Sequence, residues 1–219
     1  MTLATYISMP ETFAIREKSF MLGYKQQINP VGSGFLQTID RTVPLWGCEF
    51  KTPPLSDERY DIAITFLRSL QGSRNPFLAW DPRRIMPRAY QHLPAASDPW
   101  TQTGQTNPII TAMTPAASTI KLGQMQNGAT ISPGDYISYK VGNIWMLHVA
   151  MEQKVAASNE ATVKVEPAPF IGLSGTPAVV YRRATAAFKM LGGFKEDDSV
   201  DSKPVLSFKA VQFIDRAVS

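Results

Sequence analysis

The sequence contains only one cysteine, Cys48, and two histidines among its 219 residues. A lone thiol excludes an intramolecular disulfide framework and a zinc site built from several cysteines, so we expect packing alone to stabilise the fold. Cys48 lies between Trp46 and Phe50 in an apolar segment. We therefore interpret it as a core residue rather than as a nucleophile.

Long apolar runs and strong charge are missing as well. Because no run of about eighteen apolar residues occurs, no segment is predicted to span a membrane. Residues 1–6 lack the charged lead and the long apolar stretch of a secretory signal, so we expect synthesis in the cytoplasm. The net charge of +4 is too weak to indicate a dedicated nucleic-acid binder.

The sequence contains few of the residue patterns that are typical of enzyme active sites. His148 lies in an apolar run, where a hydrogen-bonded core imidazole is expected, and His92 lies beside a polar connection, where we expect it to be solvated. Ser33 and Ser174 have glycine neighbours, but neither completes the Gly-x-Ser-x-Gly pattern of a hydrolase nucleophile. We predict no enzymatic activity and no catalytic residues.

Two candidate ligand sites lack the required spacing. The first is a group of carboxylates, Glu196, Asp197, Asp198 and Asp201. They do not follow the alternating pattern of a calcium-binding loop, so we expect a solvated acidic turn. The second is the pair Gly192-Gly193, which no helix signal follows, so it does not indicate a phosphate-binding loop. We predict no metal site and no cofactor.

A single helix is predicted over residues 56–71. Ser56 suits the N-cap, Asp57 and Glu58 place negative charge at the positive end of the helix dipole, and Gly72 suits the left-handed residue after its end. One apolar stripe is formed by Ile62, Ala63, Phe66, Leu67 and Leu70. A strand-like segment that begins at Leu45 and stops at Pro53-Pro54 precedes the helix, and a second one within residues 75–82 follows it. We therefore expect the stripe to cover one face of a β-sheet.

The composition changes near residue 93, which indicates a division of the chain. Residues 93–104 are rich in Pro, Ser, Ala and Thr, as is typical of a connection. Between residues 104 and 178, several short strand-like segments follow one another without a helix, which is typical of a small barrel or sandwich. Longer strand-like segments then return. The pattern predicts a domain of residues 104–178 inserted into a domain formed by residues 1–95 and 180–219.

The first forty residues are less regular. Segments 21–25 and 31–35 are punctuated by glycine and only partly strand-like. They could supply either a hairpin or a flexible arm that becomes ordered on assembly.

The order of these features resembles the distal tail proteins of long-tailed bacteriophages and prophages. The resemblance extends from about Thr42 to Phe213 and rests on the order of the features rather than on one motif. The features are a strand, Pro53-Pro54, the acidic start of the helix, Gly72, the strand at Phe77, Asp81-Pro82, the turn Gly134-Asp135-Tyr136 and the segment from Val163 to Pro167.

This resemblance implies a mainly β protein, with a tail-tube-like β-sandwich, one packed helix and the inserted small β domain on the periphery. It also implies a homo-oligomeric ring, usually of six subunits, at the distal end of the tail in the virion. The implied partners are the tail tube protein on one side and the baseplate hub or tail-tip proteins on the other. DNA would pass through the lumen without specific binding, and a host-surface glycan is a further candidate partner for the inserted domain.

The candidates for contacts between subunits are Arg83, Arg84, Arg88, Trp80, Tyr90 and Trp100. Guanidinium groups form bidentate pairs with carboxylates, and Trp, Tyr and Arg dominate the energetic hot spots of interfaces. A solvated loop is the alternative interpretation of the three arginines. Arg182, Arg183 and Lys189 leave the same two interpretations open.

Two other functions stay open. The chain could be another tail component, such as the tube subunit or a tail-completion protein, which would differ in copy number. It could also be a carbohydrate-binding module for host attachment, with Tyr136, Tyr139 and Trp145 lining a sugar-binding surface. Core packing is the competing interpretation of these aromatic residues, and we expect Trp46 and Trp145 in the core.

Overall fold

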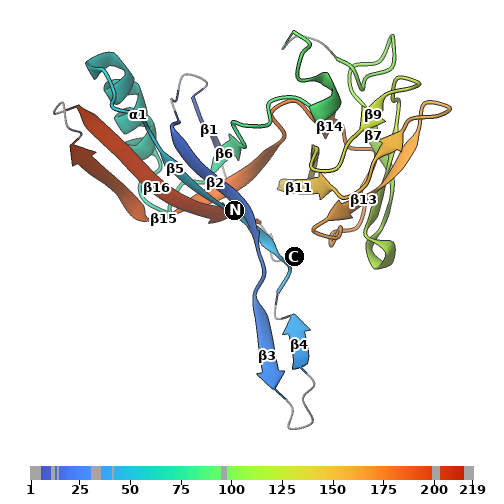
Figure 1. The fold of residues 1–219 in the computed structure, drawn as a ribbon, viewed down its shortest axis with the longest axis horizontal. Helices are drawn as coiled ribbons and strands as arrows, with labels where there is room; N and C mark the ends of the chain where they lie inside the picture. The colour runs from blue at the N-terminus through green and yellow to red at the C-terminus, as the bar shows by residue number, and fades with distance from the viewer. Residues whose placement is uncertain are drawn as a thin grey trace. The chain divides into compact units, whose positions relative to one another are not determined.

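The computed structural model describes residues 6–10, 13, 15–30, 36–40, 42–94, 98–198 and 203–214. Over these residues the fold is mainly β, as the sequence predicts (Figure 1). The described part contains one α-helix, α1 (Asp57–Ser69), and two short 3-10 helices, η1 (Arg88–Tyr90) and η2 (Pro115–Ala117).

The first six-stranded sheet has the strand order β1-β6-β15-β16-β5-β2. Its strands are β1 (Ile7–Ser8), β6 (Phe77–Trp80), β15 (Thr185–Asp198), β16 (Pro204–Gln212), β5 (Leu45–Lys51) and β2 (Glu17–Gly23). Strand β1 is parallel to β6, β15 is antiparallel to β6, and β5 is antiparallel to both β16 and β2. Strands β1 and β2 are therefore the outermost strands of this sheet.

The second six-stranded sheet has the strand order β14-β10-β11-β13-β8-β7. Its strands are β14 (Val179–Val180), β10 (Tyr136–Val141), β11 (Ile144–Ala150), β13 (Ala161–Glu166), β8 (Thr119–Gly123) and β7 (Ile109–Thr114). All of these neighbours pair in antiparallel fashion. Two smaller antiparallel sheets pair β12 (Lys154–Val155) with β9 (Thr130–Ile131), and β3 (Gln26–Pro30) with β4 (Leu36–Asp40).

The chain forms two compact units. The central unit comprises residues 1–9, 74–188 and 213–219, and the helical unit comprises residues 10–73 and 189–212. Residues 104–178, predicted as an insertion, lie within the central unit. The division falls elsewhere than at residues 95 and 180, because residues 74–94 and 180–188 group with the central strands. Strand β15 has residues in both units.

Helix α1 begins and ends close to the predicted residues. Ser56 precedes it with extended backbone, but its side chain makes no capping hydrogen bond, so the predicted hydroxyl cap is wrong. Asp57 and Glu58 occupy the first turn, as predicted. Gly72 follows the helix with a φ of +67°, in the left-handed region that glycine favours.

The buried stripe of α1 differs from the prediction at one residue. The buried residues are Ala63, Ile64, Phe66, Leu67 and Leu70, whereas Ile62 is 38% exposed. Successive helical residues are rotated by about 100°, so a stripe centred between Ala63 and Leu67 leaves Ile62 at its margin. The sequence pattern did not single out Ile64.

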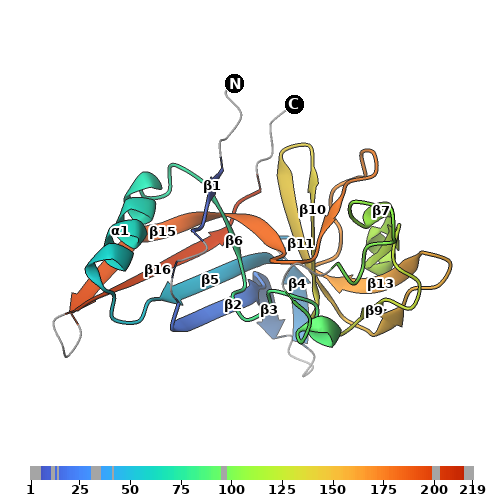
Figure 2. The ribbon, with the colours of Figure 1, turned by 90° about the horizontal axis from the view of Figure 1, so that it is seen from above.

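Helix α1 covers one face of the sheet in the helical unit, as predicted (Figures 1 and 2). The ring of Phe13 lies 5.7 Å from the ring of Phe66 on α1 and 6.0 Å from the ring of Phe208 on β16. Phe208 in turn lies 5.4 Å from Phe50 on β5. Since Phe50 and Phe208 alternate along their strands with the exposed residues Glu49 and Lys209, the opposite face of the sheet is polar.

Trp100 belongs to the core of the central unit. Its side chain is 0% exposed, its Nε1 donates a hydrogen bond to the Thr130 carbonyl oxygen at 3.0 Å, and its ring stacks on Tyr181 at 4.8 Å. The segment around it, predicted as a connection, therefore contributes to a hydrophobic core. Residues 95–97 lie outside the described part of the chain.

Two further segments differ from the sequence interpretation. Glu196 and Asp197 are in β15 rather than in a turn, and the Glu196 carboxylate accepts a hydrogen bond from the Tyr60 hydroxyl of α1 at 2.8 Å. The irregular N-terminal segment forms the hairpin of β3 and β4, which was one of the two alternatives. Residues 31–35, and with them Ser33, lie outside the described residues, as does Asp201.

Candidate interaction surfaces

The predicted arginine segment follows β6 and is organised by a buried carboxylate. Asp81 is almost fully buried, and its Oδ1 accepts hydrogen bonds from the backbone N of Arg83 at 2.9 Å and from the Nε of Arg83 at 3.3 Å. The backbone N of Arg84 donates to the Asp81 carbonyl oxygen at 2.9 Å. Burial, together with the nearby Asp81 charge, raises the pKa of Tyr136 to about 12.

A second buried carboxylate, Asp135, attaches the segment to the central strands. Its Oδ1 accepts from the backbone N of Arg88, and its Oδ2 accepts from the backbone N of Ser132, both at 2.7 Å. Burial raises the pKa of Asp135, against the opposing effect of these two hydrogen bonds. The Nη1 of Arg84 donates to the Gly134 carbonyl oxygen at 2.8 Å.

Gly134 is required for this contact. Its φ is +86°, and a Cβ built on it would lie 2.8 Å from the Nη1 of Arg84. Any other residue would therefore be strained and would displace the guanidinium group.

The aromatic interface candidates make contacts within the chain that bury them partly or wholly. The Tyr90 hydroxyl accepts a hydrogen bond from the backbone N of Thr130 at 2.7 Å, and the guanidinium carbon of Arg183 lies 5.5 Å from the ring centroid of Trp80. Trp80 and Tyr90 are half-buried, and both keep some exposed surface. Trp100 must be removed from the interface candidates, because its side chain is fully buried in the core.

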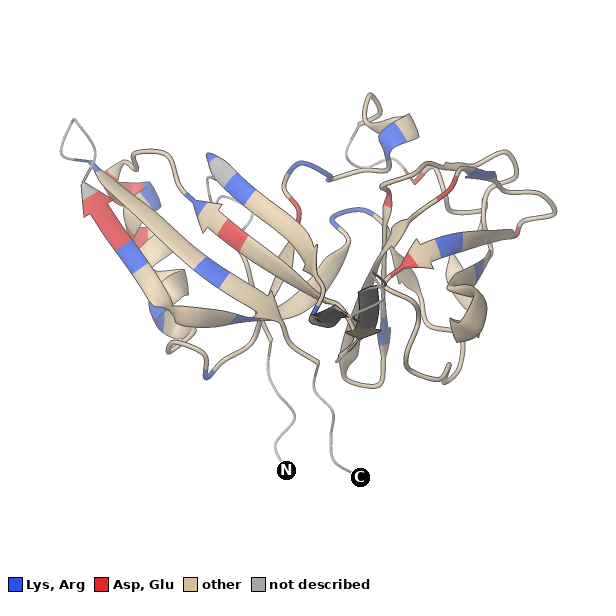
Figure 3. Cartoon of the chain, turned by 60° about the horizontal axis from the view of Figure 1, so that its bottom comes forward, with Lys and Arg blue, Asp and Glu red and all other residues tan. Residues whose placement is uncertain are grey.

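A second arginine turn lies beside the first. The backbone N of Arg183 donates to the Ile85 carbonyl oxygen at 2.8 Å, and the Nη2 of Arg182 lies 3.1 Å from the Oδ1 of Asp98. The segment is a loop bound to the central strands, and Arg83 and Arg88 in it are exposed. Figure 3 marks the positions of Lys and Arg along the chain in blue.

We define the arginine surface as Arg83, Ile85, Arg88 and Arg183. The side chain of Arg83 is 51% exposed and Ile85 is 42% exposed, and Arg88 is exposed as well. The acidic neighbours Asp81 and Asp135 are buried beneath this surface. The charge presented to solvent is therefore positive and surrounds an exposed apolar side chain.

Of the three aromatic residues proposed to bind sugar, one lies in the core and two are half-buried. Tyr139 is 1% exposed, and its hydroxyl lies 3.0 Å from the Nε2 of His148, so Tyr139 cannot line a sugar-binding surface. His148 is fully buried, which confirms the predicted core histidine, and burial lowers its pKa to about 4. Tyr136 and Trp145 are half-buried.

The remaining single-residue predictions concern positions outside these surfaces. Trp46 and Cys48 are buried on β5, which confirms both core predictions. Burial raises the pKa of the Cys48 thiol well above its usual range, which disfavours the nucleophilic thiolate. His92 is exposed, as predicted.

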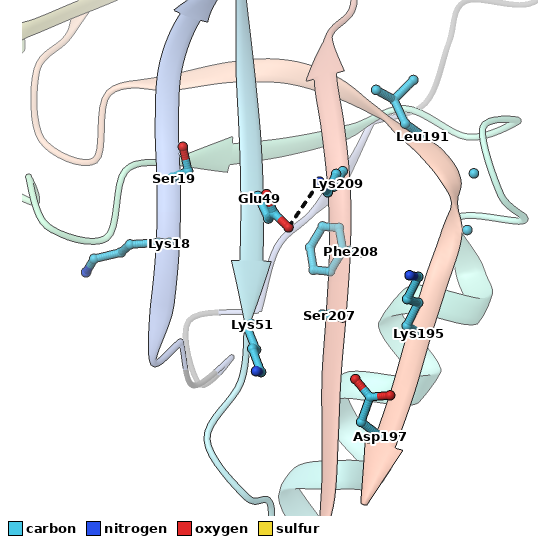
Figure 4. A pocket seen from close by; sticks show the side chains of 12 residues that line it. Lys18, Ser19, Glu49, Lys51, Leu191, Lys195, Asp197, Ser207, Phe208 and Lys209 are labelled. Atoms are coloured by element: carbon cyan, nitrogen blue, oxygen red, sulfur yellow. Dashed lines mark ion pairs between the residues drawn. The ribbon is translucent and has the colours of Figure 1, made fainter.

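A groove of about 740 Å³ lies on the sheet face opposite α1, and it is lined by charged residues together with Leu191 and Phe208 (Figure 4). Its charged lining residues are Lys18, Glu49, Lys51, Lys195, Asp197 and Lys209. The Nζ of Lys209 lies 3.3 Å from the Oε1 of Glu49, and both side chains are exposed. The mixed signs of charge make this a hydrated surface rather than a site for one strongly charged ligand.

Within the residues that the structure describes, no group of three or more His, Cys, Asp or Glu side chains is placed to hold a metal ion. No helix of the described ranges is long and apolar enough to cross a membrane.

No protein-family model matches this sequence, and a search of curated proteins finds no match. The proposed function therefore rests on the geometry of the structure.

Proposed function

We propose that this chain is a structural subunit that assembles with copies of itself, most simply six, into a ring at the distal end of a bacteriophage tail. The ring would join the tail tube to the baseplate hub or tail tip and leave a channel for DNA. The observation that carries the proposal is the six-stranded sheet that α1 covers on one face, with a polar opposite face and with outermost strands at both sides.

The outermost strand β2 supports assembly through the sheet. Strand β2 has seven residues and pairs with β5 along its whole length. An outermost strand of this length presents the backbone groups of its other side for pairing with another chain. Met21 in this strand lies on the same face of the sheet as Ser19 and is 66% exposed. A ring of subunits would cover such an edge.

The polar sheet face supports a channel. Glu49 pairs in register with Ser19 on one side and with Lys209 on the other, so small and charged side chains of both signs form a row across three strands. Such a face is hydrated, and Glu49 and Asp197 offset part of the positive charge of its lysines, which weakens the attraction for a phosphate backbone. These properties favour passage of DNA over its binding.

The hairpin of β3 and β4 supports a contact with another subunit. The two strands form a sheet of their own, and an isolated two-stranded hairpin is only marginally stable in water. Tyr24 and Ile39, which lie at its base and in its second strand, are both exposed apolar residues. The tail tube or a neighbouring copy would supply the surface that stabilises this hairpin.

The proposal predicts an assembly of defined size. The purified chain, alone and mixed with the tail tube protein of the same phage, would be measured by mass photometry and imaged by negative-stain electron microscopy. We expect closed rings with a central opening. Monomers at high concentration that also fail to bind the tube protein would refute the proposal, and a stack of many rings would favour the tube subunit instead.

A further inference from the structure

The arginine surface has the composition of an interface centre. Exposed Ile85 lies among Arg83, Arg88 and Arg183, and arginine is among the residues that dominate interface hot spots. The backbone of Arg88 is fixed by the buried Asp135 carboxylate. The side chain of Arg88 is exposed, so its guanidinium group can reach a partner from a fixed backbone position.

The exposed face of α1 has the complementary composition. Glu58, Asp61 and Ile62 are spaced by three and four residues, so they share one face of the helix, and all three are exposed. Asp57 in the first turn adds a further negative charge beside them. We define the acidic surface as Asp57, Glu58, Asp61 and Ile62. Its apolar residue is the one that the sequence pattern assigned to the core and the structure leaves exposed.

We propose that the acidic surface of one copy binds the arginine surface of the next copy. This inference rests on the proposed ring, for which it supplies a contact between neighbouring subunits. Guanidinium groups would pair with the carboxylates of Glu58 and Asp61, while Ile62 and Ile85 exclude water between them. The two surfaces carry opposite charges and each has one exposed apolar side chain, so a second copy of this chain is the partner that fits.

The proposed contact is directional. Because the two surfaces lie on different parts of the chain, the contact is head to tail, and such contacts propagate until a ring closes. Exposed charge pairs are screened by salt, so the assembly should weaken as the salt concentration rises from 50 mM to 500 mM.

The test uses two full-length variants with similar-sized side chains. In R83Q/R88Q the arginine surface loses two charges, and in E58Q/D61N the acidic surface loses two. We expect each variant alone to self-associate at least ten-fold more weakly than the wild-type chain in sedimentation velocity. In an equimolar mixture, the acidic surface of the first variant and the arginine surface of the second are both intact. The mixture should therefore give 1:1 heterodimers and no larger assembly.

The control R74Q/K164Q loses two exposed positive charges outside both surfaces and should assemble like the wild-type chain. Thermal unfolding of each variant verifies that it is folded. Unchanged assembly of both variants, or a mixture that stays monomeric, would overturn the head-to-tail contact, although wild-type rings would still support the proposed function. A wild-type chain that stays monomeric at high concentration and also fails to bind the tail tube protein would refute the proposed function instead.

Discussion

At the scale of single residues, Tyr139 and His148 have their proton positions fixed by their surroundings. The Nδ1 of His148 lies 2.6 Å from the carbonyl oxygen of Pro167, which can only accept, so Nδ1 carries the hydrogen. Nε2 of the neutral ring then accepts the hydroxyl hydrogen of Tyr139 at 3.0 Å. The Sδ of Met113 also lies 3.0 Å from this hydroxyl, but the single hydrogen is already used. A second proton on His148 would disrupt this arrangement.

The buried His148 predicts a loss of stability in mild acid. Its pKa is lowered by burial from 6.5 to about 4, so between these values the unfolded chain binds a proton that the folded chain does not. The contribution of His148 is complete above the unfolded pKa and declines as the pH falls towards the folded pKa. We expect His148 to lower the free energy of unfolding by about 2 kcal/mol between pH 7.5 and pH 5, as measured by urea denaturation.

The exposed His92 provides the matched control. His92→Gln should keep the pH dependence of the wild-type chain, whereas His148→Gln should be less stable at pH 7.5 and should lose most of the dependence. If both variants retained the same slope of unfolding free energy against pH, His148 would not be the group responsible.

Residues differ in how far the sequence reveals their environment. The core position of His148 follows from its apolar neighbours along the chain. That of Trp100 does not, because its neighbours are polar or proline-rich, and its partners Thr130 and Tyr181 are distant in sequence. Local composition therefore indicated a connection where contacts between distant segments formed a core.

At the scale of elements, the ends of α1 were predictable because charge, proline and glycine act locally. The identity of its buried face was less so, since the apolar residues from Ile62 to Leu70 span more than one face. The sheet beneath selects the arc centred between Ala63 and Leu67. Strand β15 shows the same limit, because its acidic end is extended through pairing in the sheet and not through local preference.

Two substitutions in α1 test which face is packed. Leu67→Ala removes a fully buried side chain and should lower the free energy of unfolding by about 3 kcal/mol. Ile62→Ala at the exposed position should change it by about 0.5 kcal/mol or less. Both are measured by urea denaturation of the same preparation. Equal losses for the two variants would mean that Ile62 is packed as deeply as Leu67.

At the scale of the whole molecule, the sequence predicted the mainly β fold class, which the structure confirms. It also predicted two domains, and the two compact units of the structure divide the chain at other residues. The residues of the division were not predictable. Composition changes near residue 93, but the preceding segment is tied to the central strands by the bonds of Arg84 to Gly134 and of Arg88 to Asp135. Each of these bonds joins a side-chain atom to a backbone atom about fifty positions away along the chain, and no local pattern reveals it.

Removal of the β3–β4 hairpin tests its part in assembly. The last pair between β2 and β5 is Gly23 with Leu45, so an Asn-Gly turn in place of residues 24–44 would join the two strands directly. We expect the variant to fold with an unfolding midpoint within about 3 °C of the wild-type value. Its affinity for the tail tube protein should fall at least ten-fold in biolayer interferometry. Undiminished affinity would assign the tube contact to another part of the chain.

The outermost strand β2 also bears on how the chain would behave before it joins the proposed ring. Its seven residues, with Met21 exposed, form an edge with which another extended polypeptide can pair, including a misregistered copy. Copies that fail to close into the proposed ring should therefore form amorphous precipitate or fibrils, whereas copies within a ring should stay in solution.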